Sequence, residues 1–128
     1  MRKALCPSYS QEQFGGNSGY LLFGTEHKVW PKSIEVQGMN KEVARIIPLG
    51  GATAKSETDA DARKKARRPL GEWNSMEIAV KGGAITASIN ETRISTVSEY
   101  DPKEGWIGFQ SEGAEIQWKN IRLRAEKE

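Results

Sequence analysis

A carboxylate and an amide stand two residues apart in this chain, at Glu35 and Gln37. Residues 33–37 alternate between polar and apolar types, so both side chains would project from one face of a strand. Trp30 and Lys32 precede them closely. Carboxylates and amides bind neighbouring hydroxyl groups, and an aromatic ring covers the apolar face of a pyranose. The strand is therefore a candidate floor for a carbohydrate, although a polar strand face is also typical of plain solvated surface.

A second group of polar residues lies far from this strand in sequence. Gln110 and Glu112 end an apolar run just before a glycine turn, where rigid scaffolds commonly carry their sites. Asn17 lies in a glycine-rich turn, and His27 follows in a predicted loop. Each has a plain alternative, because turns and surface histidines need no function. We expect these four residues to be further candidates for binding or proton transfer.

Four tryptophans could serve as sugar platforms. Trp73, Trp106 and Trp118 lie within predicted strands, which favours the core over a binding surface. Trp30 precedes a proline in a loop and is the better platform candidate.

The remaining composition excludes several classes of protein. One histidine and one cysteine cannot form a histidine-rich or cysteine metal site, and neither a nucleophile elbow nor a nucleotide-binding loop is present. We therefore expect no metal and no organic cofactor. The chain lacks an apolar run of about 18 residues, so we expect no membrane span. Its net charge is +2, and the basic cluster at 63–68 reads as a solvated loop rather than a nucleic-acid surface.

The order of elements predicts an all-β domain. Short alternating stretches at 75–80 and 85–89 flank a Gly-Gly turn, and similar runs recur to residue 124. Strands this short and this closely spaced predict a sandwich or barrel. With 128 residues, the chain reads as a single domain, residues 1–128. We expect a loose arm over residues 1–14 and a long polar loop over 53–70, with a short helix at 59–66 as an alternative inside that loop.

Five motifs in order resemble the 3-keto-disaccharide hydrolase domain family, once described as a domain of unknown function: NSG at 17–19, IEVQ at 34–37, GEWN at 71–74, GFQSEG at 108–113 and EIQWKNIRL at 115–123. The resemblance implies a concanavalin A-like lectin/glucanase fold. This is a jelly-roll β-sandwich of two antiparallel sheets, here expected to lack some N-terminal strands. Members are mostly exported, but the chain shows no signal peptide, so its location stays open.

The resemblance also implies an activity on 3-keto-glycosides and 3-keto-disaccharides. A base removes the proton at C2, the aglycone leaves from C1, and water adds to the resulting glycal. On this basis Glu35 is the expected base and Glu112 a second candidate acid. Lys32 or His27 would polarise the ketone. The expected hydroxyl-binding residues are Asn17, Gln37 and Gln110, with Trp30 as the platform.

Two other classes of function remain open. The same fold serves non-catalytic, lectin-like carbohydrate-binding modules, because a fold does not fix a function. A structural sandwich that forms a homodimer through its sheet edges is the third reading. The expected partner in the first two readings is a glucoside or 3-keto-glucoside, with no nucleic acid and no membrane.

Overall fold

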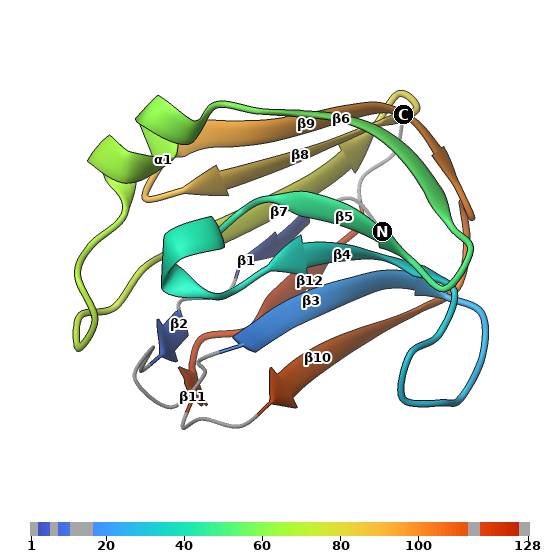
Figure 1. Ribbon diagram of the computed structural model, residues 1–128, viewed down its shortest axis with the longest axis horizontal. Helices are drawn as coiled ribbons and strands as arrows, with labels where there is room; N and C mark the ends of the chain where they lie inside the picture. The colour runs from blue at the N-terminus through green and yellow to red at the C-terminus, as the bar shows by residue number, and fades with distance from the viewer. Residues whose placement is uncertain (1–2, 6–7, 11–16, 113–115, 126–128) are drawn as a thin grey trace.

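The computed structural model describes residues 3–5, 8–10, 17–112 and 116–125. Within these residues the structure is mostly β and forms a sandwich in which all paired strands are antiparallel (Figure 1). The first sheet has six strands in the order β12 (Arg122–Arg124), β1 (Lys3–Leu5), β7 (Met76–Lys81), β8 (Ala84–Ile89), β9 (Thr92–Asp101) and β6 (Thr53–Thr58). The second has four, in the order β10 (Trp106–Glu112), β3 (Asn17–Gly24), β4 (Ser33–Gln37) and β5 (Ile46–Leu49). The expectation of a β-sandwich of two antiparallel sheets is confirmed.

Three short elements complete the described structure. A two-stranded ribbon pairs β2 (Ser8–Ser10) with β11 (Ile116–Trp118). The 3-10 helix η2 (Asn40–Glu42) connects β4 to β5, and α1 (Ala60–Ala66) connects β6 toward β7. Among the described residues, no helix is long and apolar enough to cross a membrane.

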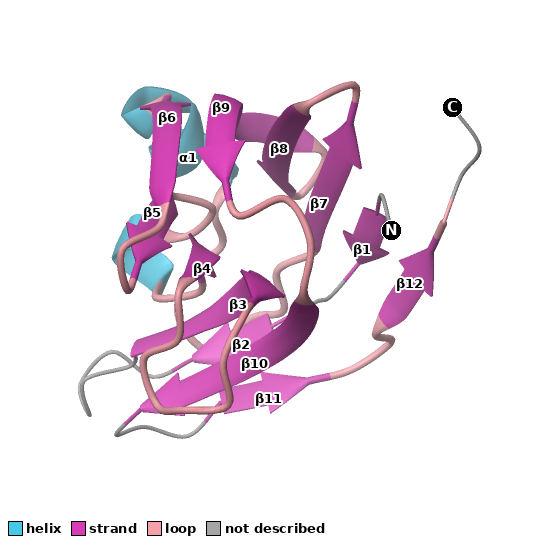
Figure 2. Ribbon diagram, turned by 90° about the vertical axis from the view of Figure 1, so that its right-hand side faces the viewer, coloured by secondary structure: helices cyan, strands magenta, loops and turns pink. Residues whose placement is uncertain are grey.

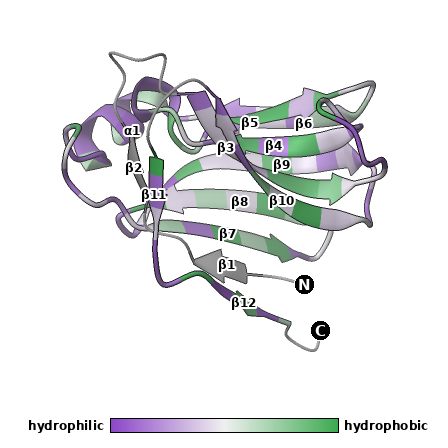
Figure 3. Ribbon diagram, turned by 90° about the horizontal axis from the view of Figure 1, so that it is seen from below, coloured by the Kyte–Doolittle hydropathy of each residue, from purple (hydrophilic) through white to green (hydrophobic). Residues whose placement is uncertain are grey.

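The core lies between the two sheets. Ile34 and Val36 face it from β4, and Ile85, Ala87 and Ile89 face it from β8; all five are fully buried. This follows from the alternation of side chains along a strand, which Figure 3 shows as changing bands of hydropathy. The sheets approach each other along one edge, where β5 leads into β6 (Figure 2). There the Ser56 hydroxyl donates to the Ile46 carbonyl at 3.3 Å.

Two segments differ from the sequence expectation. The arm expected over residues 1–14 contains β1 and β2, while residues 1–2, 6–7 and 11–14 lie outside the described residues. The polar loop expected over 53–70 contains β6 and α1, so the helical alternative is the better description of 59–66. The sequence pattern was weak because β6 is an edge strand exposed along most of its length. The helix is short and begins at Asp59, whose carboxylate accepts from the Ala62 amide at 2.9 Å.

The segment that follows α1 is attached to the six-stranded sheet through two asparagines. The Asn90 amide donates to the Ala66 carbonyl at 2.8 Å and to Asn74 Oδ1 at 2.9 Å. Asn74 Oδ1 also accepts from the Arg68 amide at 2.8 Å. Asn90 adopts a left-handed backbone conformation, φ 48°, in the turn between β8 and β9, and asparagine tolerates this conformation well. The helix and its return loop are therefore held against the end of the sheet opposite the β3–β4 connection.

Candidate functional site

The outer face of the four-stranded sheet collects polar residues from three strands. On β4, Ile34 and Val36 point into the core, so Glu35 and Gln37 point outward. Register aligns Gly19 of β3 with Gln37 on one side and Gln110 on the other, and pairs Asn17 with Glu112. Residues directly opposite each other in an antiparallel sheet share a face. We call the following set the polar face: Asn17, Glu35, Gln37, Gln110 and Glu112.

Phe109 fixes which side of β10 faces outward. Its ring meets the buried Tyr20 ring edge-on, with centroids 5.6 Å apart, so Phe109 lies on the core side. Its neighbours Gly108 and Gln110 therefore lie on the outer side, in line with the alternation of the strand.

Glu35 is a buried carboxylate on this face, with only 5% of its surface exposed. It lies against the backbone of Gly19, where a Cβ atom would come within 2.5 Å of Glu35 Oε1. Burial, followed by the nearby Glu112 charge, raises the pKa of Glu35 from 4.5 to about 7. Among the described residues no cation forms an ion pair with it. Glu35 can therefore hold or release a proton near neutral pH.

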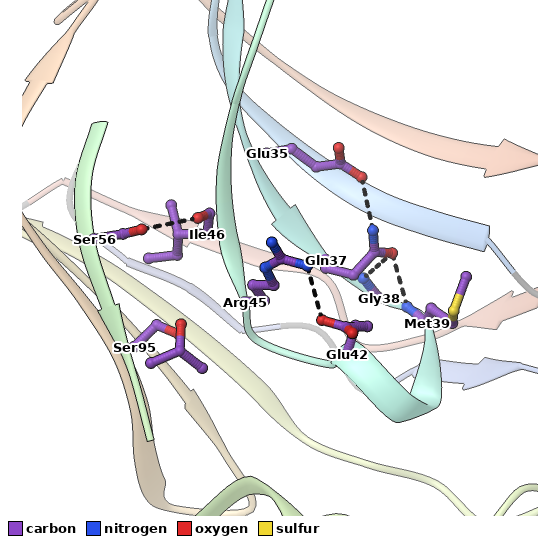
Figure 4. Close-up of polar contacts among 10 residues, drawn as sticks. Glu35, Gln37, Gly38, Met39, Glu42, Arg45, Ile46, Ser56 and Ser95 are labelled. Atoms are coloured by element: carbon purple, nitrogen blue, oxygen red, sulfur yellow. Dashed lines mark hydrogen bonds and ion pairs between the residues drawn. The ribbon is translucent and has the colours of Figure 1, made fainter. Parts of the chain in front are cut away.

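Gln37 is fixed by the backbone beside Glu35 (Figure 4). Its Oε1 accepts hydrogen bonds from the Gly38 and Met39 amides, both at 3.0 Å. These contacts orient the other end of the amide, and Nε2 donates to Glu35 Oε1 at a long 3.4 Å. Gln37 thus positions the Glu35 carboxylate with a weak hydrogen bond that leaves much of its acceptor capacity free.

Asn17 and Gln110 each carry a buried oxygen without a hydrogen-bond partner among the described residues. Asn17 Nδ2 donates to Glu112 Oε2 at 2.9 Å, which leaves Asn17 Oδ1 unsatisfied. Gln110 Oε1 is likewise unsatisfied. An unpaired buried polar atom costs about 1–3 kcal/mol, so such atoms usually serve a ligand or water. Two unsatisfied acceptors therefore lie on the polar face that carries Glu35.

Trp106 also lies on this outer side, against the expectation that it belongs to the core. A bulge at Phe23, φ 58°, shifts the register so that Trp106 pairs with Gly24 and Gly108 pairs with Leu21. The indole rests on the two glycines: a Cβ at Gly108 would lie 2.8 Å from Trp106 Cζ3, and one at Gly24 would collide with the ring. Glycines inside strands mark such close approaches, and this was the signal that the sequence offered.

His27, in the loop between β3 and β4, lies next to Trp106. Its ring is nearly parallel to the Trp106 indole, at 11°, with centroids 6.1 Å apart. Trp118, by contrast, packs against the core and stacks on Phe109, as expected of a strand tryptophan. Trp73 is partly buried, with the Lys119 ammonium 4.2 Å from its ring centroid.

Trp30 and Lys32 stand apart from the polar face in the contacts of the described residues. Lys32 Nζ forms an ion pair with Asp101 Oδ2 at 3.1 Å, and the Lys32 amide donates to Glu26 Oε1 at 3.3 Å. Trp30 is 49% exposed in the β3–β4 loop. Their roles as ketone-polarising group and platform stay predictions. Within the described part of the chain, no group of three or more histidine, cysteine or acidic side chains could hold a metal ion.

The fold and its outer face define a β-sandwich that presents a buried carboxylate among amide and aromatic groups. Residues 8–124 match the model of the 3-keto-alpha-glucoside-1,2-lyase-like domain, and the chain belongs to this family.

Two solved structures share the fold. A crystal structure named "putative glycosyl hydrolase" from Parabacteroides distasonis has a TM-score of 0.67 at 21% identity, over 97% of this chain and 77% of that one. A second crystal structure of the same name and organism has a TM-score of 0.63 at 16% identity, over 93% and 67%. A search of curated proteins found no match.

Proposed function

We propose that this chain cleaves 3-keto-glucosides, including 3-keto-disaccharides, by elimination across C1 and C2 followed by hydration, with Glu35 as the base. Membership in the 3-keto-alpha-glucoside-1,2-lyase-like family supports the substrate class and the bonds involved. The observation that carries the assignment to Glu35 is its buried carboxylate on the outer face, lying over Gly19 and held by Gln37. A base is most effective when its pKa is near the working pH, which fits a pKa of about 7.

The proposed reaction has two steps. The ketone at C3 acidifies the hydrogen at C2, and the Glu35 carboxylate takes that proton. The electron pair enters the C2–C3 enolate and then forms the C1–C2 double bond as the C1–O bond breaks. The leaving oxygen takes a proton, which releases the aglycone and leaves a 2-hydroxy-3-keto-glycal. Water then adds a hydroxyl at C1 and a proton at C2, so the net change is hydrolysis.

The neighbouring side chains supply the other roles. The unsatisfied oxygens of Asn17 and Gln110 accept hydrogen bonds from sugar hydroxyls. Trp106 Nε1 is buried and has no hydrogen-bond partner among the described residues, and a shift of the ring would let it donate to a sugar oxygen. Glu112 and His27 are the candidates that return a proton to the leaving oxygen. Lys32, which pairs with Asp101, would have to leave that ion pair to reach a substrate ketone.

Release of a chromogenic aglycone from 3-keto-glucosides of both anomers tests the assignment, with the unoxidised glucosides as controls. We expect turnover of the keto sugars alone. Glu35→Gln keeps the size of the side chain but removes the base, and we expect it to lower kcat about 100- to 10,000-fold. Glu99→Gln, an exposed change on β9 in the other sheet, is the matched control. Full activity in Glu35→Gln would exclude Glu35 as the base.

The pH dependence of kcat/KM gives a second test. A base acts in its ionised form, and the pKa of Glu35 is raised to about 7. We therefore expect kcat/KM to rise with pH and to level off above about pH 7. Measurement from pH 5 to 9 checks this. A plateau that is already complete at pH 5 would exclude Glu35 as the base.

A non-catalytic carbohydrate-binding module is the second candidate. The unsatisfied oxygens of Asn17 and Gln110 would serve binding without any chemistry at Glu35. Binding of a glucoside by the wild-type chain, with no turnover of its 3-keto form, would favour this function. Glu35→Gln would then weaken binding only in proportion to the hydrogen bonds it loses.

A further inference from the structure

We propose that a basic surface at one end of the sandwich binds an anionic polysaccharide. We call the following set the basic surface: Arg63, Lys64, Lys65, Arg67, Arg68 and Lys119. Five of these six lie within residues 63–68, on α1 and the two residues after it. The inference goes beyond the proposed function, because it concerns where the protein attaches and needs no chemistry at Glu35.

The first support is positive charge without a partner. The sequence has 19 basic and 17 acidic residues, and since five of the basic ones lie within residues 63–68, the rest of the chain is net negative. The Asp59 carboxylate accepts from the Ala62 amide as the cap of α1. Among the described residues, no ion pair joins Asp61 or Glu72 to the basic surface. Positive charge is therefore concentrated at this end of the molecule.

The second support is that this concentration disfavours α1. The Arg67 amide donates to the Arg63 carbonyl at 3.0 Å, so these two residues lie one helical turn apart. Like charges at this spacing destabilise a helix, although the dipole at the helix C-terminus offsets part of the effect. Lys64 and Lys65 lie at the same end. A bound anion would remove the repulsion among these cations.

The third support is that the backbone holds two guanidinium groups in place. Arg67 Nη1 donates to the Asn40 carbonyl, and Arg68 Nη1 donates to the Trp73 carbonyl, both at 3.0 Å. The helix η2, which carries Asn40, lies at the same end of the sandwich as α1 (Figure 1). Neutral carbonyls orient these groups without neutralising them, and each guanidinium has five N–H donors, most of which stay free for a ligand. Groups that are fixed in advance lose little entropy on binding.

The basic surface fits a polysaccharide better than a single-stranded nucleic acid or a membrane. Single strands stack their bases on aromatic rings, but the Lys119 ammonium occupies a face of the Trp73 ring, 4.2 Å from its centroid. Membrane-surface helices insert large apolar side chains, whereas α1 has only alanines among its charged residues, and Leu70 is the one exposed large apolar residue between 59 and 72. Short runs rich in lysine and arginine are typical of sites for acidic polysaccharides. Anionic groups that repeat along a sugar chain can contact several of these cations at once.

Titration with polymers of known charge tests the proposal. Polygalacturonate carries carboxylates, dextran sulfate carries sulfates, and dextran is the neutral control. We expect the wild-type chain to bind at least one of the two polyanions, more weakly as salt increases, and not to bind dextran. The tighter of the two polyanions identifies the anionic group that the surface prefers.

A triple variant locates the binding. Arg63→Gln, Lys64→Gln and Lys65→Gln together remove three cations that form no ion pair among the described residues, and glutamine preserves the helix propensity. We expect the affinity for the polyanion to fall about tenfold or more. The matched control has the same net charge but combines exposed positions on other elements, and it should change the affinity little: Lys55→Gln, Lys81→Gln and Lys103→Gln.

Asp61→Asn gives a test in the opposite direction. It removes an acidic group from the same helix, so we expect tighter binding of the polyanion. This variant decides the matter if the triple variant does not fold, and unchanged or weaker binding in it would then count against the proposal.

Three results would overturn the proposal: no binding of either polyanion, equal losses in the triple variant and its control, or tighter binding of another class of ligand. For the last, duplex DNA and phosphatidylserine-containing vesicles are titrated at the same salt concentration, and a preference for either over both polysaccharides would assign the surface to nucleic acid or to a membrane. None of these measurements uses turnover, so they stand apart from the test of the elimination at Glu35.

Discussion

At the scale of single residues, Glu35 combines two properties that oppose each other in energy. Its carboxyl is almost fully buried, which disfavours the charged form, yet the proposed role as a base requires that form. Among the described residues, the carboxylate receives one long hydrogen bond, from Gln37, and the Glu112 charge lies nearby, so little within this part of the chain compensates for burial. Stronger hydrogen bonds would lower the pKa and make the base weaker. The sparse surroundings of Glu35 are therefore consistent with a group that must accept a proton.

This arrangement predicts how stability depends on pH. The pKa of Glu35 is 4.5 in the unfolded chain and about 7 in the folded protein, so the folded state binds the proton more tightly. The free energy of unfolding should then fall as pH rises from about 4.5 to 7, by about 3 kcal/mol in total at 1.4 kcal/mol per pKa unit. Glu35→Gln cannot ionise, so we expect it to lack this loss.

Urea unfolding at pH 4 and pH 8 measures the effect. The variant and the wild type should have similar stability at pH 4, and the variant should be more stable at pH 8. A wild type that is the more stable at pH 8 would mean that ionised Glu35 has a stabilising partner.

The sequence predicted the residues of this site in part. It did not predict which of them meet or on which side of the sheet Trp106 lies, for a physical reason. Alternation along one strand was enough to place Glu35 and Gln37 on a common face. Asn17, Gln110 and Glu112 were found as separate candidates, but their meeting depends on the pairing of β3 with β4 and β10. Trp106 was assigned to the core because its orientation depends on a bulge at Phe23, which the alternation of residue types does not show; the strand glycines were the only local signal.

At the scale of elements, the main contribution of β3 next to Glu35 is a glycine, Gly19, which leaves room for the Glu35 side chain. Gly19 lies at the centre of the polar face, and its missing side chain is where Glu35 lies. A strand pays for an internal glycine in conformational entropy, so the residue needs a packing reason.

Gly19→Ala tests this reason. Its Cβ would come within 2.5 Å of Glu35 Oε1, so we expect the carboxylate to move and the protein to lose about 1–3 kcal/mol of stability. Activity should fall with it. Adding Glu35→Asp shortens the side chain by one methylene, and we expect the double variant to recover part of the lost stability in thermal unfolding. No loss in Gly19→Ala, or no recovery in the double variant, would mean that the carboxylate and this glycine are not in contact.

The elements also show where sequence patterns lose information. The strands β7 and β8 were evident from alternation because one face of each is buried. The strand β6 was not, because it lies at the edge of the sheet and five of its six residues are exposed. The strand β6 is held to β9 by backbone hydrogen bonds, and the residue types of an exposed edge strand give little indication of such pairing.

At the scale of the whole molecule, the two sheets depend on each other. The described apolar core is shared, with Ile34 and Val36 from β4 facing Ile85 and Val97 from β8 and β9. The polar face lies on the other side of β4, one residue away from this core. The position of Glu35 therefore depends on the packing of its neighbours on β4, Ile34 and Val36, against the other sheet.

This dependence predicts that the sheets unfold together. Ile34 and Ile85 are both fully buried, one in each sheet, and Ile→Val at such a site costs about 0.5–1.5 kcal/mol. If unfolding is a single cooperative transition, either substitution should lower the protection of the slowest-exchanging amides in β4 and in β8 by the same free energy. Native-state hydrogen exchange of the two variants measures this strand by strand. A loss confined to the strand that carries the substitution would show that each sheet opens alone.

In that case the polar face would lose its order while the six-stranded sheet stays folded, and activity would fall at a lower temperature than the main unfolding transition. Equal losses in both strands would instead tie the activity to the stability of the whole sandwich.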